Sequence, residues 1–251
     1  MVGTIALMVI LFGSGVCLAQ ETNRPAFRLG VDVLADGGFQ ELKDKRVGLV
    51  TNPSGVDGQG VPTWKRFREA STVNLVALYG PEHGVFGKVG AGKHVSGERH
   101  GEDRNSDGKI SKDEETGIRV FSLYGDTRKP TPRMLEGVDV MVYDLQDVGC
   151  RSYTYISTLG LVMEAAAEKG IEVMVLDRPN PLGTRRVEGP RPQGTDVIPS
   201  FIGQYDIPYV YGLTVGELAR WINDHYLRRP CRLSVIPMKG WSQEMTWEDT
   251  G

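Results

Sequence analysis

The sequence predicts an α/β fold: a Rossmann-like layered domain with a mostly parallel sheet. Three observations support this prediction: apolar runs typical of buried strands, helical patterns between those runs, and polar residues directly after several of them. Strands that are apolar throughout are buried on both faces, which is typical of parallel sheets covered by helices on two sides.

The expected strands are short runs rich in aliphatic and β-branched residues, the types that favour extended backbone. Each run is too short for a long helix and is bounded by polar or turn-forming residues. They are RVGLVT (46–51), VNLVALY (73–79), DVMVYDL (139–145), IEVMVLD (171–177) and RLSVIPM (232–238).

Three segments between these runs have the apolar spacing of amphipathic helices: residues 63–70, 155–169 and 214–227. The third begins with Thr214, followed three residues later by Glu217, which is a capping-box signature. In the second segment one apolar face is formed by Ile156, Leu159, Val162, Met163 and Ala166.

Composition and the N-terminal residues set the expected organisation. Residues 1–19 combine an apolar stretch with the small residues Cys17-Leu18-Ala19, which favours a cleaved signal peptide and a secreted or periplasmic protein. A short membrane anchor is the alternative, but the run is too short to span a bilayer comfortably, so we expect no stable membrane insertion.

The charge balance argues against nucleic acid as a partner, because the chain of 251 residues has a net charge of −3. Removal of residues 1–19 leaves two cysteines, Cys150 and Cys231. They could form one disulfide in an oxidising compartment or remain two separate thiols, and the sequence leaves both possibilities open.

An insertion at residues 97–117 contains DRNSDGKISKDE (103–114), which has the spacing of an EF-hand calcium loop. Oxygen donors at alternate positions converge on one point, and Gly108 supplies the sharp turn. The flanking residues make poor helices, so we expect a structural Ca²⁺ site, with a solvated acidic loop as the alternative. The expected ligands are Asp103, Asn105, Asp107, Lys109 (through its carbonyl), Ser111 and Glu114.

Polar side chains follow four of the predicted strands. In an open parallel sheet, ligands bind in the crevice outside the carboxyl ends of the strands. Four such groups therefore indicate a site at one edge of the sheet. They are Asn52; Glu82 and His83; Asp144, Gln146 and Asp147; and Asp177, Arg178 and Asn180.

One stretch, YDLQDVGCRSYTYIST (143–158), combines acidic, amide, guanidinium and aromatic groups. Carbohydrate sites use such a mixture, since hydroxyls need hydrogen bonds and the apolar face of a sugar packs on aromatic rings. Arg151, Tyr153 and Tyr155 are the candidates for these contacts. Tyr155 could equally serve only to pack the start of the following helix.

Several long motifs resemble, in order, the exo-β-N-acetylmuramidases of the NamZ type. They are GLVTNPSGV, LYGPEHGVFG, SLYGDTRKPT, MLEGVDVMVYDLQDVGCRSYTYISTL, MEAAAEKG, VLDRPNPLG and YGLTVGELAR. The resemblance runs from about Val47 to Gly251. It implies a Rossmann-like catalytic domain at residues 20–212, followed at residues 213–251 by the start of a truncated C-terminal domain, an incomplete second α/β domain. It implies a secreted or periplasmic glycoside hydrolase that needs no catalytic cofactor. Such an enzyme releases N-acetylmuramic acid from the non-reducing ends of peptidoglycan fragments or muropeptides. A non-catalytic binder of muropeptides or other glycans is the alternative.

The resemblance makes Glu82 the candidate general acid, since a leaving glycosidic oxygen must be protonated. His83 would position Glu82 or the substrate, or would be structural. A second carboxylate could come from Asp144, Asp147 or Glu164, or the acetamido group of the substrate could take its place.

The remaining candidates would bind substrate. Arg151 and Arg178 suit the lactyl carboxylate of muramic acid, although either could instead form a structural ion pair with Asp147 or Asp177. The other expected substrate-binding residues are Asn52, Gln146, Tyr153, Asp177 and Asn180. The sequence leaves the stereochemistry and the oligomeric state open.

Overall fold

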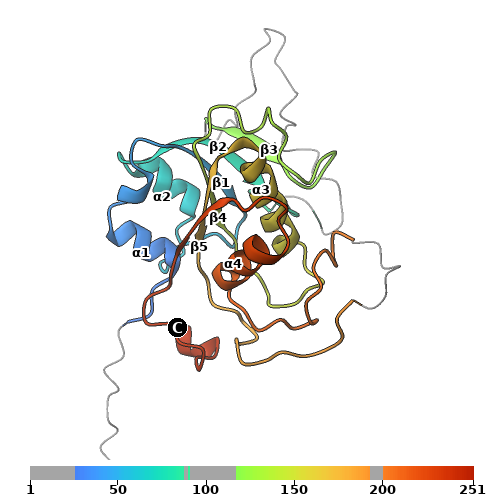
Figure 1. Cartoon of the computed structure of the whole chain (residues 1–251). Helices are drawn as coiled ribbons and strands as arrows, with labels where there is room; N and C mark the ends of the chain where they lie inside the picture. The colour runs from blue at the N-terminus through green and yellow to red at the C-terminus, as the bar shows by residue number, and fades with distance from the viewer. Residues whose placement is uncertain (1–25, 88–89, 91–116, 193–199) are drawn as a thin grey trace, which may run out of the picture.

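The computed structural model describes residues 26–87, 90, 117–192 and 200–251 (Figure 1). At its centre is a six-stranded parallel sheet of order β3-β2-β1-β4-β5-β6, the order of a doubly wound α/β fold. The strands are β1 (Arg46–Thr51), β2 (Asn74–Gly80), β3 (Arg119–Ser122), β4 (Val140–Asp144), β5 (Glu172–Leu176) and β6 (Arg232–Ile236).

The five predicted strands are confirmed to within two residues at each end. Their apolar residues are buried because helices cover both faces, as the near-continuous burial along β1 and β4 shows. β3 was not among the predicted strands. It is four residues long and lies at the sheet edge, so its apolar pattern is short.

Helices pack on both faces of the sheet (Figure 1). α1 (Gly30–Asp36) and α2 (Thr63–Glu69) cover one face, and α3 (Tyr155–Lys169) and α4 (Val215–His225) cover the other. Each face has its own apolar core, one built with α1 and α2 and the other with α3 and α4. Two short 3-10 helices, η1 (Gln40–Leu42) and η2 (Glu248–Thr250), complete the described elements.

The three predicted helices are confirmed, and their ends follow local chemistry. α4 begins with the predicted capping box: the Thr214 hydroxyl accepts from the Glu217 N–H at 3.2 Å, and the Glu217 carboxylate accepts from the Thr214 N–H at 2.9 Å. α3 ends at Gly170, whose φ of +70° suits a residue without a Cβ.

The boundary predicted between residues 212 and 213 falls inside the layered domain. β6 pairs with β5 over five residues, and α4 contributes Leu218, Ala219 and Ile222 to the core it shares with α3. These elements after residue 213 therefore complete the sheet, and the assignment of all of residues 213–251 to a second domain is corrected. The predicted signal peptide and the six calcium ligands lie outside the described residues.

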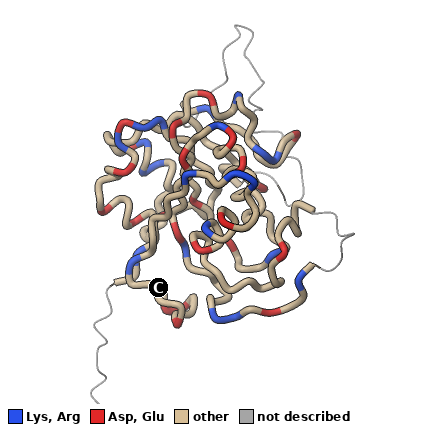
Figure 2. Tube along the Cα trace, in the orientation of Figure 1, with Lys and Arg blue, Asp and Glu red and all other residues tan. Residues whose placement is uncertain are grey.

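Within the described ranges, no helix combines the length and apolar character required to cross a bilayer. Both cysteines are free: Cys150 follows β4, whereas Cys231 is buried just before β6 begins, at the opposite edge of the sheet. Basic and acidic residues are interspersed along the chain trace (Figure 2).

Candidate active site

The sheet order creates a crevice at the carboxyl ends of β1 and β4. These two strands are neighbours, yet the helix after β1 packs on one face of the sheet and the helix after β4 on the other. The connections diverge there, which is where open α/β sheets bind ligands. Asn52 follows β1 and Asp144 ends β4.

Glu82 follows β2, at the same carboxyl edge of the sheet. The turn that carries it is closed by a hydrogen bond from the Gly84 N–H to the Pro81 carbonyl at 2.8 Å, and His83 has a φ of +73°. A positive φ at the third residue is the pattern of a type II turn, where glycine or asparagine is usual. The partly buried Glu82 carboxylate accepts a hydrogen bond from the Thr154 hydroxyl at 2.7 Å, at the N-terminus of α3.

Two tyrosines lie beside Glu82. Burial, followed by the charge of Glu82, raises the pKa of Tyr124, and Glu82 is also its hydrogen-bond partner. The same two causes raise the pKa of Tyr155, whose hydroxyl accepts from the Asn52 amide at 2.8 Å. Both phenols therefore stay protonated at neutral pH, and Glu82 has one aromatic neighbour from the loop after β3 and another from the first residue of α3.

Asp144 and Arg178 form a buried ion pair. The Arg178 Nε and Nη2 atoms donate to the two carboxylate oxygens at 2.7 and 3.0 Å, and the two side chains are 4% and 0% exposed. The Thr63 hydroxyl adds a bond of 2.5 Å to the same carboxylate, and Arg178 also donates to the Val56 carbonyl. These groups hold the loops after β1, β4 and β5 together. Neither Asp144 as a catalytic carboxylate nor Arg178 as a lactyl ligand fits this arrangement.

Asp177 caps α4. Its carboxylate accepts from the Gly216 N–H at 2.8 Å, from the Arg178 N–H at 3.0 Å and from the Thr214 hydroxyl at 3.0 Å. Burial raises the pKa of Asp177 to about 6. Its donors are the backbone and side-chain groups at a helix N-terminus, so the contacts of Asp177 are structural.

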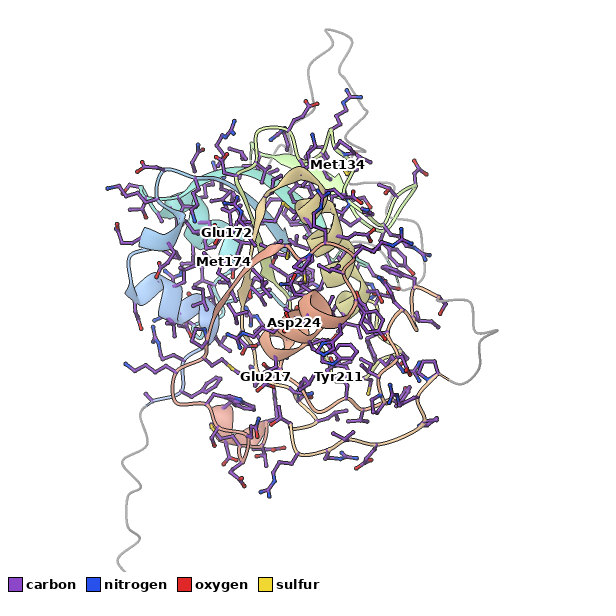
Figure 3. The ribbon with its side chains drawn as sticks, in the orientation of Figure 1. Met134, Glu172, Met174, Tyr211, Glu217 and Asp224 are labelled. Atoms are coloured by element: carbon purple, nitrogen blue, oxygen red, sulfur yellow. The ribbon has the colours of Figure 1, made fainter. Side chains whose placement is uncertain are left out.

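Asp147 is also buried. One oxygen accepts from the Gly149 N–H at 2.8 Å and from the hydroxyl of Tyr211, which Figure 3 labels near the first turn of α4. The other oxygen has no hydrogen-bond partner among the described residues and lines a small pocket with room for about one water molecule. Burial raises the pKa of Asp147 to about 6. Asp147 thus ties the loop after β4 to the segment before α4.

The predicted amide ligands chiefly hold loops. Gln146 donates to the Pro179 carbonyl at 2.8 Å, and Asn180 donates to the Leu213 carbonyl at 3.0 Å. A side chain at Gly149, where φ is +82°, would place its Cβ 2.2 Å from the Asn180 oxygen. Close packing of these loops therefore requires glycine at this position. The packing also fixes the backbone at this edge of the sheet.

The other candidates differ in position. Arg151 is partly buried and donates to the Pro190 carbonyl at 3.2 Å, while Tyr153 is 50% exposed. Glu164 lies more than two turns along α3 from Tyr155 and forms an ion pair with Lys129 at 3.0 Å, so the structure does not bring it to Glu82. Across the described segments, no three His, Cys, Asp or Glu side chains converge to hold a metal ion.

Comparison with known proteins shows the family of the chain. Residues 47–251 match the family described as "Exo-beta-N-acetylmuramidase NamZ, N-terminal". The chain belongs to this family. It is 43% identical over 233 residues to the peptidoglycan beta-N-acetylmuramidase NamZ of Bacillus subtilis (strain 168), a match that covers 92% of this chain and 52% of that protein.

Two solved structures of DUF1343 family proteins from Bacteroides fragilis NCTC 9343 share the fold. One has a TM-score of 0.78 and 49% identity, covering 89% of this chain and 53% of that one. The other has a TM-score of 0.68 and 29% identity, covering 89% and 55%. This member of the NamZ family thus spans about half the length of the relatives that it matches.

Three residues of this NamZ family member were not predicted: Tyr124, which contacts Glu82, and Arg128 and Phe201, which pack against Tyr124. The guanidinium carbon of Arg128 lies 4.4 Å from the centre of the Phe201 ring and 5.5 Å from that of Tyr124. Tyr124 follows the end of β3, so the strand-end rule would have found it had β3 been recognised. Phe201 carries no such signal, because it comes from a loop remote in sequence.

Proposed function

We propose that this protein is a peptidoglycan glycoside hydrolase that releases N-acetylmuramic acid from the non-reducing ends of peptidoglycan fragments. The observation that carries the proposal is the position of Glu82. It is a partly buried carboxyl at the switch point of the sheet, held by Thr154 and flanked by Tyr124 and Tyr155. A relative 43% identical to this chain is named a peptidoglycan beta-N-acetylmuramidase.

In this proposal Glu82 is the general acid. The glycosidic oxygen needs a proton as its bond to the sugar breaks, and a carboxyl within hydrogen-bonding distance supplies it. The rings of Tyr124 and Tyr155 offer surfaces on which the apolar face of a sugar can pack. The Thr154 hydroxyl fixes the direction of the carboxyl through its 2.7 Å hydrogen bond.

The second catalytic group is proposed to belong to the substrate. Asp144 is fully buried and paired with Arg178, and Asp147 is 6% exposed and bonded to Tyr211. Because neither carboxylate is exposed to a sugar, the acetamido group of N-acetylmuramic acid is the better candidate to assist at the anomeric carbon, as in substrate-assisted glycosidases.

Two further parts of the proposal rest on sequence patterns outside the described residues. Secretion or export to the periplasm would follow from cleavage after residue 19, and a structural Ca²⁺ would be held by the loop at 103–114. Peptidoglycan, the proposed substrate, lies outside the cytoplasm, which agrees with export.

The test measures release of N-acetylmuramic acid from muropeptides and release of a chromogenic leaving group from its β-glycoside. We expect the Glu82→Gln variant to lose about 100- to 10,000-fold in kcat while still binding the sugar. Glu69→Gln is the matched control, because Glu69 is an exposed carboxylate near the end of α2. Binding without release by the unaltered protein would instead support a glycan-binding role.

A further inference from the structure

We propose that Arg128, stacked on Phe201 and Tyr124, binds the carboxylate of the substrate sugar and so selects a carboxylate-bearing amino sugar over a neutral one. This inference rests on the proposed role of Glu82. N-acetylmuramic acid differs from N-acetylglucosamine by a lactyl carboxylate. Arg128 is the group that would bind this carboxylate.

The position of Arg128 is fixed by two loops at the carboxyl edge of the sheet. Arg128 lies in the loop after β3, four residues beyond Tyr124, which hydrogen-bonds Glu82. Phe201 belongs to a second loop, and its carbonyl accepts from the Ser157 hydroxyl in the first turn of α3 at 2.5 Å. The Tyr124 and Phe201 rings are 5.9 Å apart. Arg128 is therefore one aromatic ring away from Glu82.

This stacking leaves the hydrogen-bonding edge of Arg128 available. A guanidinium that lies on an aromatic ring uses its face for the contact, while its N–H groups point outward in its plane. That edge matches a carboxylate in a bidentate fork. Arg128 is exposed, and no hydrogen bond or ion pair is recorded for it within the described ranges.

The neighbouring cations have other partners. Lys129 forms ion pairs with Glu164 at 3.0 Å and Glu168 at 2.8 Å on α3. Arg178 is buried against Asp144, and Arg151 donates to the Pro190 carbonyl. Among these arginines, Arg128 is thus the one that packs against the Tyr124 neighbour of Glu82, which revises the sequence-based assignment of the lactyl carboxylate to Arg151 and Arg178.

Glu82 and Arg128 both contact Tyr124, an arrangement that suits a single sugar unit. In N-acetylmuramic acid the lactyl carboxylate and the glycosidic carbon are attached to the same pyranose ring. A sugar ring lying along the Tyr124 ring would place its glycosidic oxygen toward Glu82 and its carboxylate toward Arg128. The aromatic face between them supplies the apolar contact that sugars use.

The test compares kcat/KM of Arg128→Met with that of the unaltered protein on two chromogenic β-glycosides, one of N-acetylmuramic acid and one of N-acetylglucosamine. We expect about a 10- to 100-fold loss on the first and no change on the second, since the deleted hydrogen bonds are to a charged group. Arg128→Lys should restore part of the loss. Lys129→Met is the control, because it deletes the adjacent cation.

Equal losses on both glycosides, or no loss on either, would overturn the proposal. If the unaltered protein cleaves neither compound, the Glu82 hypothesis fails. In that case, calorimetric titration with free N-acetylmuramic acid and N-acetylglucosamine tests the role of Arg128 in sugar binding independently of catalysis. Tighter binding of the acidic sugar, lost in a folded Arg128→Met protein, supports it, whereas unchanged binding refutes it.

Discussion

The carboxyl edge of the sheet has two halves that use acidic residues differently. In the buried half, formed by Asp144, Asp147, Asp177 and Arg178, every side chain is less than 9% exposed and bonded to a fixed loop or helix end. In the open half, formed by Glu82, Tyr124, Tyr155 and Arg128, side chains are partly or well exposed. An acidic residue just after a strand therefore has a structural role in the buried half. In the open half, such a residue is available to act on a substrate.

From this comparison we predict that substitutions in the buried half lower the free energy of unfolding, whereas substitutions in the open half lower activity. Arg178→Met should lower the free energy of unfolding by about 3–5 kcal/mol, because it leaves Asp144 charged and buried without its partner. Glu82→Gln should change it by no more than about 0.5 kcal/mol, since a partly exposed amide can still accept from Thr154. Urea unfolding followed by circular dichroism measures both.

An exposed ion pair provides the control for that experiment. Arg46 and Asp139 are bonded at 2.8 Å, but their side chains are 52% and 40% exposed. Arg46→Met should therefore lower the free energy of unfolding much less than Arg178→Met does. If Arg46→Met lowered the free energy of unfolding as much as Arg178→Met, burial would not distinguish the two ion pairs.

The second prediction concerns pH. Asp147 has a pKa of about 6 in the folded protein, above its ordinary value of 3.8, so the folded state keeps a proton that the unfolded state loses. Its favourable contribution is complete below about pH 4 and is lost as the pH rises through 6. Asparagine does not titrate, so between pH 5 and pH 8 the stability of Asp147→Asn should rise by on the order of 1 kcal/mol relative to that of the unaltered protein.

That gain is measured as the difference between urea unfolding curves of the two proteins at each pH. Asp177, whose pKa is also raised to about 6, is present in both proteins and cancels. A difference that does not change with pH would show that Asp147 keeps an ordinary pKa in the folded state.

The last prediction concerns the stability contributed by the cap at the start of α4. Thr214→Ala removes the hydroxyl that accepts from the Glu217 N–H and donates to Asp177, and should cost about 1 kcal/mol. Thr214→Ser keeps that hydroxyl and should cost less. Thermal unfolding of the three proteins orders them, and equal melting temperatures would deny the cap a role in stability.

Much of the fold could be predicted because its signals are local. Apolar runs marked five strands, and Thr214 with Glu217 marked the start of α4. β3 was missed because four residues at a sheet edge carry little periodicity, and α1 was not among the segments recognised as helical. The domain boundary was misplaced because sheet membership of β6 depends on pairing with β5, which no local pattern reveals.

The site was predictable in part for the same reason. The strand-end rule placed Asn52, Glu82 and Asp144 at one edge of the sheet. It could not show that Asp144 is paired with Arg178, since that bond joins residues 34 positions apart and depends on burial. The stacking of Arg128 on Phe201 likewise exists only in three dimensions.

His83 has a consequence for how this sequence can vary over time. Its backbone has a φ of +73°, which costs a residue other than glycine on the order of 1 kcal/mol. Random drift would exchange it for glycine or asparagine wherever the imidazole is dispensable. A histidine that persists here among distant homologues would therefore record selection on its ring, independently of any assay.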